Sequence, residues 1–146
     1  MGINRNLALR VLCIFVGATI VPLVIARQEP SVWDGIYSQA QADRGQALYT
    51  KACASCHRAN LVSRGQTPSL SGSGFLEKWD GQTLGDLFEK MQTSMPADHP
   101  GSLSREENAA VLAFILRFNE FPSGDTDLRT DADWLATVRF KAAKSK

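Results

Sequence analysis

The chain has few residues that could bind a metal or form a disulfide, and no pattern typical of strands. Its 146 residues include three cysteines and two histidines. The sequence contains no regular alternation of polar and apolar residues, no internal repeat and no low-complexity block. These absences exclude sheet and repeat architectures, and the helical spacing described below predicts an all-α protein.

The sequence also lacks a strong charge of one sign. It has 16 Lys and Arg against 15 Asp and Glu. Removing Arg5 and Arg10 with the N-terminal segment leaves 14 basic residues against 15 acidic ones, a net charge of −1. Without a strong field of one sign, we expect neither nucleic acid nor an anionic membrane surface as a partner.

The longest apolar run is too short for an ordinary membrane span. It covers residues 11–26, whereas a spanning helix normally needs about 20 residues. Basic residues precede the run, and it ends in Val24 and Ala26 at a spacing that signal peptidase accepts. We therefore expect residues 1–26 to be a signal peptide cleaved near Ala26, an uncleaved anchor being the alternative. The mature protein is expected to be periplasmic, monomeric and without a membrane span.

Capping-box patterns predict where three helices begin. They pair Ser38 with Gln41, Thr83 with Asp86, and Ser104 with Glu107. The first helix is expected to lead to Cys53 and the second to run through Met91. The Ser-, Gly- and Pro-rich stretch 58–74 between them is expected to be an ordered loop.

The third predicted helix has the clearest apolar face, formed by Val111, Phe114, Ile115 and Phe118. A last short helix is expected to be capped by Thr130 and Asp133 and to end near Phe140. The expected organisation is a signal peptide (1–26), an N-terminal extension (27–37), a domain (38–118) and a C-terminal extension (119–146).

The stretch "CASCH" places Cys53, Cys56 and His57 within five positions. A redox-active or structural disulfide is one interpretation, but a redox dithiol of thioredoxin type requires a βαβ context that is missing here. Zinc bound by these residues and His99 is a second, although adjacent Cys56 and His57 would strain a tetrahedral site. The third is covalent heme, in which the thiols add to the two vinyl groups and the imidazole reaches the iron. We favour heme because two intervening residues bring both sulfurs to one side of a helical turn.

The chain resembles a class I cytochrome c of bacterial periplasmic type. The resemblance covers about residues 38–118 and is carried by "RGQALYTKACASCH", "TPSLSG", "TSMPADHPGSLS" and "ENAAVLAFIL". It implies three to five helices wrapped around one covalently bound heme c. The stretch "SMPADHPGSLSREE" is also similar to the heme domains that accompany quinoprotein dehydrogenases.

The resemblance assigns the heme-binding residues one by one. Cys53 and Cys56 correspond to the thioether attachments and His57 to the proximal iron ligand. Pro68 corresponds to the proline whose carbonyl accepts a hydrogen bond from the ligand imidazole, which sets its tautomer and ring plane. Leu70 is expected to lie against the porphyrin face.

Met95, followed by proline, corresponds to the distal iron ligand. A soft, neutral thioether favours ferrous iron and raises the potential. Two residues compete with it: Met91, otherwise a core residue, and His99, otherwise a surface residue. Trp79 is expected to donate its indole N–H to a heme propionate, with an ordinary half-buried core position as the alternative.

The remaining features have structural interpretations. Gly45 and Tyr49 correspond to the place where the family's first helix crosses its last, near Phe114. A glycine there allows the two backbones to approach closely. Trp33 and Trp134 are expected to be packing residues.

A heme iron with both axial positions filled has no open site for a substrate. We therefore expect an electron-transfer protein rather than an enzyme, carrying electrons from a dehydrogenase, with a quinoprotein as one candidate, to an oxidase or another cytochrome of a respiratory chain. One alternative is the stably bound heme subunit of a dehydrogenase complex. Another is a heme sensor or enzyme with a labile distal ligand.

Overall fold

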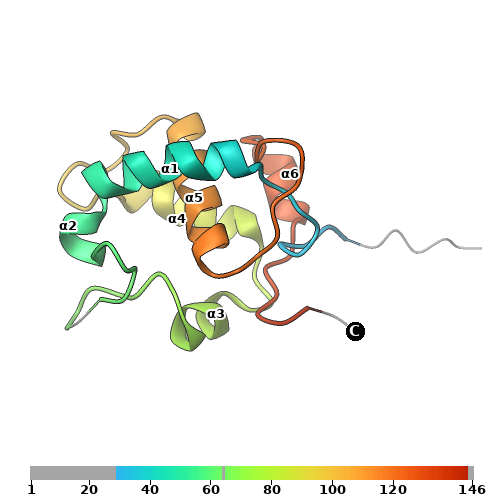
Figure 1. Cartoon of the computed structure of the whole chain (residues 1–146), viewed down its shortest axis with the longest axis horizontal. Coiled ribbons are helices and arrows are strands. Elements are labelled where there is room, and N and C mark those ends of the chain that lie inside the picture. The colour runs from blue at the N-terminus through green and yellow to red at the C-terminus, as the bar shows by residue number, and fades with distance from the viewer. Residues whose placement is uncertain (1–28, 64, 145–146) are drawn as a thin grey trace, which may run out of the picture.

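The computed structural model describes residues 29–63 and 65–144, which contain helices and isolated bridges but no strands, confirming the all-α fold class. The expected signal peptide lies outside the described residues. Figure 1 shows the helices, which are α1 (Gln39–Ala52), α2 (Ala54–His57), α3 (Ser73–Trp79), α4 (Leu84–Ser94), α5 (Arg105–Phe118) and α6 (Ala132–Thr137). This exceeds the expected three to five, partly because α2 is a single turn.

Helices α1 and α5 cross in close contact at Gly45. A Cβ atom placed on Gly45 would lie 1.8 Å from the carbonyl oxygen of Ala110, so this crossing requires glycine. One turn further along α1, the rings of Tyr49 and Phe114 have centroids 5.1 Å apart. The predicted close approach of the first and last core helices is thereby confirmed.

The predicted caps begin α1, α4 and α5. Ser38 accepts a hydrogen bond from the backbone N–H of Gln41, but the Gln41 side chain does not return it. Gln41 instead bonds both backbone groups of Leu128, with N···O distances of 2.6 and 3.2 Å. The Thr83–Asp86 and Ser104–Glu107 pairs form complete capping boxes. The first predicted box is therefore only half formed, because its amide bonds the C-terminal segment.

Two helix ends differ from the prediction. Helix α4 continues to Ser94, three residues beyond Met91. Helix α6 is capped by Asp131, whose side chain accepts a hydrogen bond from the backbone N–H of Trp134, and it ends at Thr137. The caps proposed at Thr130 and Asp133 were therefore wrong.

Helix α3 was not predicted. Its N-cap is Gly72, which offers no side-chain oxygen to the free N–H groups of the first turn. Phe75 and Trp79 are one turn apart on this helix and both are buried. The predicted loop therefore ends at Gly72 instead of Gly74.

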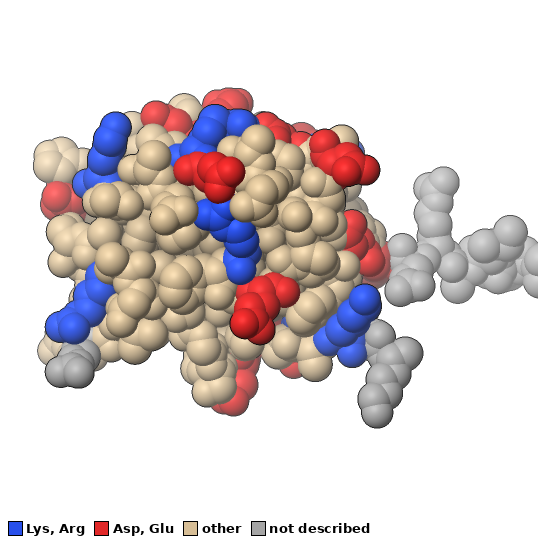
Figure 2. Space-filling view, in the orientation of Figure 1, with Lys and Arg blue, Asp and Glu red and all other residues tan. Residues whose placement is uncertain are grey.

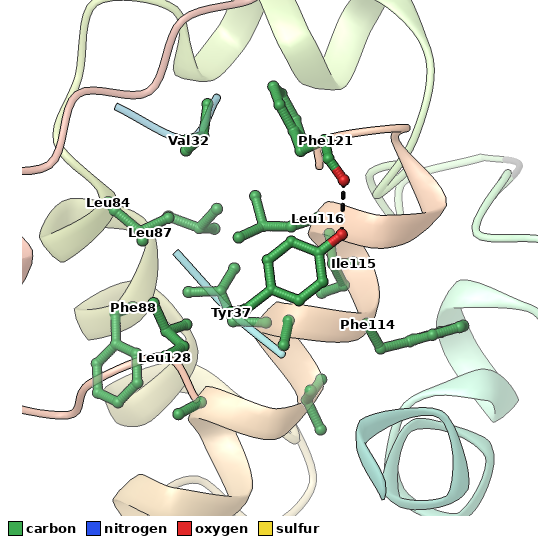
Figure 3. Close-up of a cluster of buried hydrophobic side chains, with 14 of the residues drawn as sticks. Val32, Tyr37, Leu84, Leu87, Phe88, Phe114, Ile115, Leu116, Phe121 and Leu128 are labelled. Atoms are coloured by element: carbon green, nitrogen blue, oxygen red, sulfur yellow. Dashed lines mark hydrogen bonds between the residues drawn. The ribbon is translucent and has the colours of Figure 1, made fainter. Parts of the chain in front are cut away.

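The segments expected to be N- and C-terminal extensions pack together inside one core (Figure 3). The hydroxyl of Tyr37 donates to the carbonyl oxygen of Phe121 at 2.6 Å. The indole of Trp33 donates to the carbonyl oxygen of Lys141 at 3.0 Å, and its ring meets that of Phe121 edge-on. Val32 is fully buried. Residues on both sides of 38–118 are thus integral to the domain.

The surface carries no large area of one charge on the face seen in Figure 2, where basic and acidic side chains are interspersed. Within residues 29–63 and 65–144, no helix is both long and apolar enough to cross a membrane.

Candidate functional site

The cysteine and histidine cluster forms the turn between α1 and α2. Cys53 ends α1 and begins α2. Its carbonyl oxygen accepts hydrogen bonds from the backbone N–H groups of Cys56 at 3.2 Å and His57 at 2.9 Å. This single helical turn therefore fixes the spacing of the three side chains.

The thiols of Cys53 and Cys56 are free and differ in exposure. Burial, followed by the nearby Cys56, raises the pKa of the Cys53 thiol to about 11. Burial thus favours the neutral thiol of Cys53 over its thiolate at neutral pH. Moreover, the described part of the chain brings together no group of three or more His, Cys, Asp or Glu side chains that could hold a metal ion. Neither thiol takes part in a disulfide, so both are available for attachment to another group.

His57 is 7% exposed, and one nitrogen of its ring is hydrogen-bonded to the protein backbone. Its Nδ1 atom lies 3.0 Å from the carbonyl oxygen of Pro68. Because a carbonyl can only accept, Nδ1 must carry the proton in this hydrogen bond, which leaves the lone pair on Nε2. An imidazole with this tautomer is prepared to bind a metal through Nε2.

The loop after His57 is tied to α1 and α5. The Tyr49 hydroxyl on α1 donates to the carbonyl oxygen of Arg58 at 2.7 Å. At the end of α5, the Asn119 side chain donates to the carbonyl oxygen of Leu70 at 2.9 Å and accepts from the N–H of Gly72 at 3.2 Å. These bonds explain how a segment with few apolar residues is held in one position.

The described residues enclose a cavity of about 800 Å³. This volume lies within the range typical of small-molecule and cofactor sites. Every residue that the sequence singled out as heme-binding lies in its wall: Cys53, Cys56, His57, Pro68, Leu70, Trp79 and Met95. Residues separated by up to 42 positions in the chain are thus brought to one site.

The two rivals of Met95 differ in position. His99 is not part of the cavity wall; its side chain is 77% exposed and its Nδ1 lies 3.4 Å from a carboxylate oxygen of Asp98. Met91 does line the cavity, and it is largely buried. Met95 lies at the C-cap of α4 and is partly exposed. Both methionines therefore belong to the cavity wall, and His99 does not.

Sequence reasoning missed other parts of the wall, notably Phe75 on α3 and Leu87 on α4. Phe75 precedes Trp79 by four residues, and Leu87 precedes Met91 by four, so each pair shares one helix face. That spacing was the signal that could have identified them. Lys78 and Lys90 also line the cavity, but no sequence pattern distinguished them from other surface lysines.

The donor set fits a c-type heme. Two cysteines at the spacing of thioether attachment, a histidine with a free Nε2 and a methionine all line one cavity with apolar residues in its wall. The lysines and the indole of Trp79 in the same wall are suitable partners for carboxylates. When bound there, heme would supply one-electron chemistry at iron.

Comparison with known families agrees with this donor set. A sequence model of the family described as cytochrome C oxidase, cbb3-type, subunit III matches residues 40–115. Because the match covers more than half of the chain, the protein belongs to this family of c-type cytochromes. Membership gives it heme c binding and an electron-carrying role rather than catalysis of its own.

Other comparisons add little. No curated protein matches the chain. A chain in the crystal structure of the sulfane dehydrogenase SoxCD from Paracoccus pantotrophus is similar, with a TM-score of 0.47 and 23% identity. The match covers 70% of this chain and 62% of that one, so this chain spans less than two thirds of its neighbour's length. A likeness of this extent carries no argument about partners.

Proposed function

We propose that the protein is a one-electron carrier with a single covalent heme whose iron is bound by His57 and Met95. The observation that carries this proposal is the cavity wall, which contains both thiols of "CASCH", the imidazole of His57 and the thioether of Met95. With His57 and Met95 both bound to it, the iron would have no vacant site for oxygen or a substrate. Electron transfer through the heme edge is then the remaining activity.

Each protein group has a defined role in this proposal. Cys53 and Cys56 attach the heme, and the carbonyl of Pro68 holds the Nδ1 proton of His57 so that Nε2 faces the metal. Leu70 and Trp79 line the cavity, where Leu70 would pack against the heme and the indole N–H of Trp79 would donate to a propionate. Met95 favours the ferrous state and raises the potential.

The direction of electron flow is part of the proposal. The likeness of "SMPADHPGSLSREE" to heme domains of quinoprotein dehydrogenases supports a dehydrogenase as donor. The matched family's description as an oxidase subunit supports a respiratory acceptor. Transient redox encounters use small interfaces, so a monomer that meets its partners briefly fits this role. The basic, apolar N-terminal stretch supports a periplasmic location.

The covalent attachment is tested by acid–acetone extraction of the purified protein. One heme per chain should remain with the polypeptide, because thioether bonds survive this treatment. Cys53→Ala should retain at most one thioether, as mass spectrometry of heme peptides would show. Transfer of the pigment to the solvent, or two surviving attachments in the variant, would contradict the assignment.

A further inference from the structure

The segment 95–103 joins α4 to α5 and begins with Met95. Its internal hydrogen bonds are two turns, from the N–H of His99 to the carbonyl of Pro96 at 3.0 Å and from the N–H of Ser102 to the carbonyl of His99 at 3.2 Å. These turns fold the segment locally and do not connect it to the helices on either side. Met95 itself is tied to α4, because its backbone N–H bonds the carbonyl oxygen of Met91 at 3.0 Å. The far end of the segment needs other contacts to hold it.

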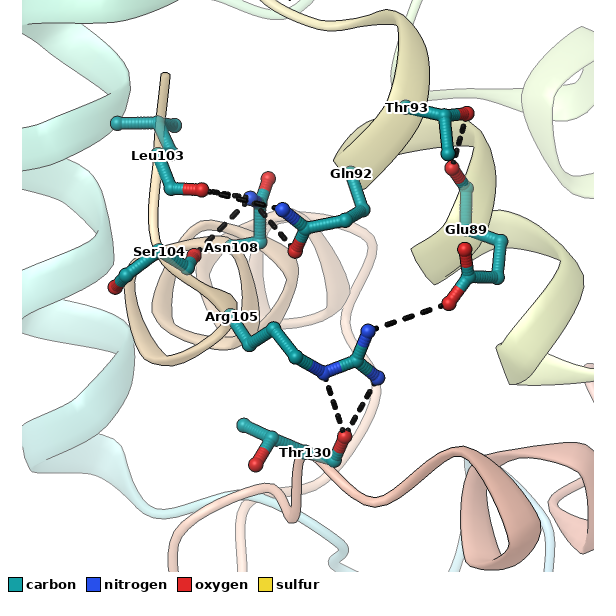
Figure 4. Close-up of polar contacts among 8 residues, drawn as sticks. All are labelled: Glu89, Gln92, Thr93, Leu103, Ser104, Arg105, Asn108 and Thr130. Carbon is teal, nitrogen blue, oxygen red and sulfur yellow. Dashed lines mark hydrogen bonds and ion pairs between the residues drawn. The ribbon is translucent and has the colours of Figure 1, made fainter. Parts of the chain in front are cut away.

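Two amide side chains connect the end of this segment to both helices (Figure 4). Gln92, on the last turn of α4, donates from Nε2 to the carbonyl oxygen of Leu103 at 3.2 Å. Asn108, in the first turn of α5, places Nδ2 3.2 Å from the same oxygen and 3.1 Å from the carbonyl oxygen of Ser104. Its Nδ2 also lies 3.3 Å from Oε1 of Gln92. We call Gln92 and Asn108 the amide clamp.

Asn108 is buried, so its side-chain amide needs the hydrogen bonds that it makes. Its side chain is 1% exposed, in a helix whose other buried residues are all apolar. Asparagine is a poor helix former and is costly to bury unless its amide is bonded. The amide is satisfied here by the two carbonyls that precede the helix and by Gln92. Its position is therefore explained by the segment it binds.

We propose that the amide clamp is a positioning device that keeps Met95 within reach of the heme iron. This inference rests on the proposed function, in which Met95 is the distal ligand. Met95 leaves α4 only three residues after Gln92, and the carbonyl of Leu103 receives one bond from each helix. The clamp therefore fixes both ends of segment 95–103 at a constant separation.

Single and double substitutions distinguish a clamp from ordinary packing. In Gln92→Leu or Asn108→Leu, the Leu103 carbonyl keeps one side-chain donor; in the double variant it keeps neither. Because a half-buried carbonyl that loses both donors is costly, segment 95–103 should loosen, and the double variant should bind carbon monoxide in the ferrous state about tenfold faster than wild type. Each single variant should change the rate less than about threefold. The ferric near-infrared band of sulfur-bound iron should weaken in the same order.

Arg105→Leu is the matched control. Arg105 begins α5 and bonds the carbonyl of Thr130 at 2.7 and 3.1 Å and Glu89 on α4 at 3.3 Å, in the same view of Figure 4. The control thus removes bonds from the same helix turn without touching segment 95–103. It should lower stability and leave both the carbon monoxide rate and the band unchanged. An equal increase in the carbon monoxide binding rate in the control and the double variant would overturn the clamp.

The outcomes separate the two proposals. A wild-type protein that lacks the band and binds carbon monoxide at once would refute Met95 as ligand, and the clamp with it. A wild-type band that persists unchanged in the double variant would refute the clamp alone. If the double variant loses its heme, Asn108→Asp takes the place of the double variant in the test. A carboxylate facing two carbonyls repels them, so Asn108→Asp should bind carbon monoxide faster than Asn108→Leu. Equal rates in those two variants would overturn the clamp.

Discussion

Adding one methyl group at Gly45 should destabilise the protein, although alanine is the better helix former. An ideal Cβ there would lie 1.8 Å from the Ala110 carbonyl oxygen and 2.4 Å from its carbon, where 3.4 Å is an ordinary contact. Since both groups are backbone, α1 and α5 must separate by roughly 1.5 Å. Overpacking of this kind costs about 1–3 kcal/mol, and loosening the Tyr49–Phe114 pair about 0.5–1.5 kcal/mol. Helix propensity returns about 1 kcal/mol, which leaves a net loss of roughly 2 kcal/mol.

Guanidinium unfolding of the ferric holoprotein, followed by far-ultraviolet circular dichroism, measures this loss. The matched control is Ala47→Gly on the exposed face of the same helix. It changes only helix propensity and should cost about 1 kcal/mol. A Gly45→Ala protein as stable as wild type, or more stable, would refute the close crossing of α1 and α5.

Two further predictions concern the packing of the chain ends and the cap of α4. Tyr37→Phe removes the hydrogen bond to the Phe121 carbonyl and should lower the unfolding free energy by about 1 kcal/mol; no loss in the same unfolding assay would show that this bond does not tie the terminal segments together. Hydrogen bonds from the Thr83 side chain and then its backbone hold the pKa of Asp86 below its usual range. Its stabilising contribution is therefore present above the unfolded-state pKa of about 4 and is lost as the pH falls through the lowered folded-state value. Asp86→Asn should accordingly be less stable than wild type at pH 7, and the difference should shrink at acidic pH; a constant difference would contradict this assignment.

Much of the fold could be predicted because its signals are local. A capping box involves residues three apart, and Thr83–Asp86 and Ser104–Glu107 both form as predicted. Helix α3 gave no such signal, because its N-cap is a glycine. Phe118, the last residue of α5, belongs to the predicted apolar face but is 42% exposed, and its ring meets that of Phe114 edge-on with centroids 6.1 Å apart.

The packing of residues 29–37 against the C-terminal segment was beyond sequence reasoning. Residues 29–37 show no helical or strand period, and their contacts with the C-terminal segment join residues more than 80 positions apart. Gln41 illustrates the difficulty, because a residue with a plausible local capping role bonds Leu128 instead. Local preferences do not decide between such competing partners.

The residues of the candidate site also differ in how far the sequence predicts them. Cys53, Cys56 and His57 are recognisable because their chemistry is concentrated in one helical turn. Pro68 and Met95 needed the family resemblance, since their distance from His57 is set by the loop and by α4. The amide clamp had no sequence signature, because an asparagine inside a helix is unremarkable until its buried partners are known.

The central claim is that Met95, and neither Met91 nor His99, is the distal ligand of the heme iron. The most direct measurement is the near-infrared sulfur-to-iron band of the ferric protein in wild type and in Met95→Ala, Met91→Ala and His99→Ala. We predict that the band is present in wild type and that only Met95→Ala abolishes it, with a lower potential and new carbon monoxide binding. A band that survives in Met95→Ala and disappears in Met91→Ala would move the ligand to Met91, which also lines the cavity. A wild-type protein without the band, whose spectrum changes in His99→Ala, would contradict histidine–methionine ligation altogether.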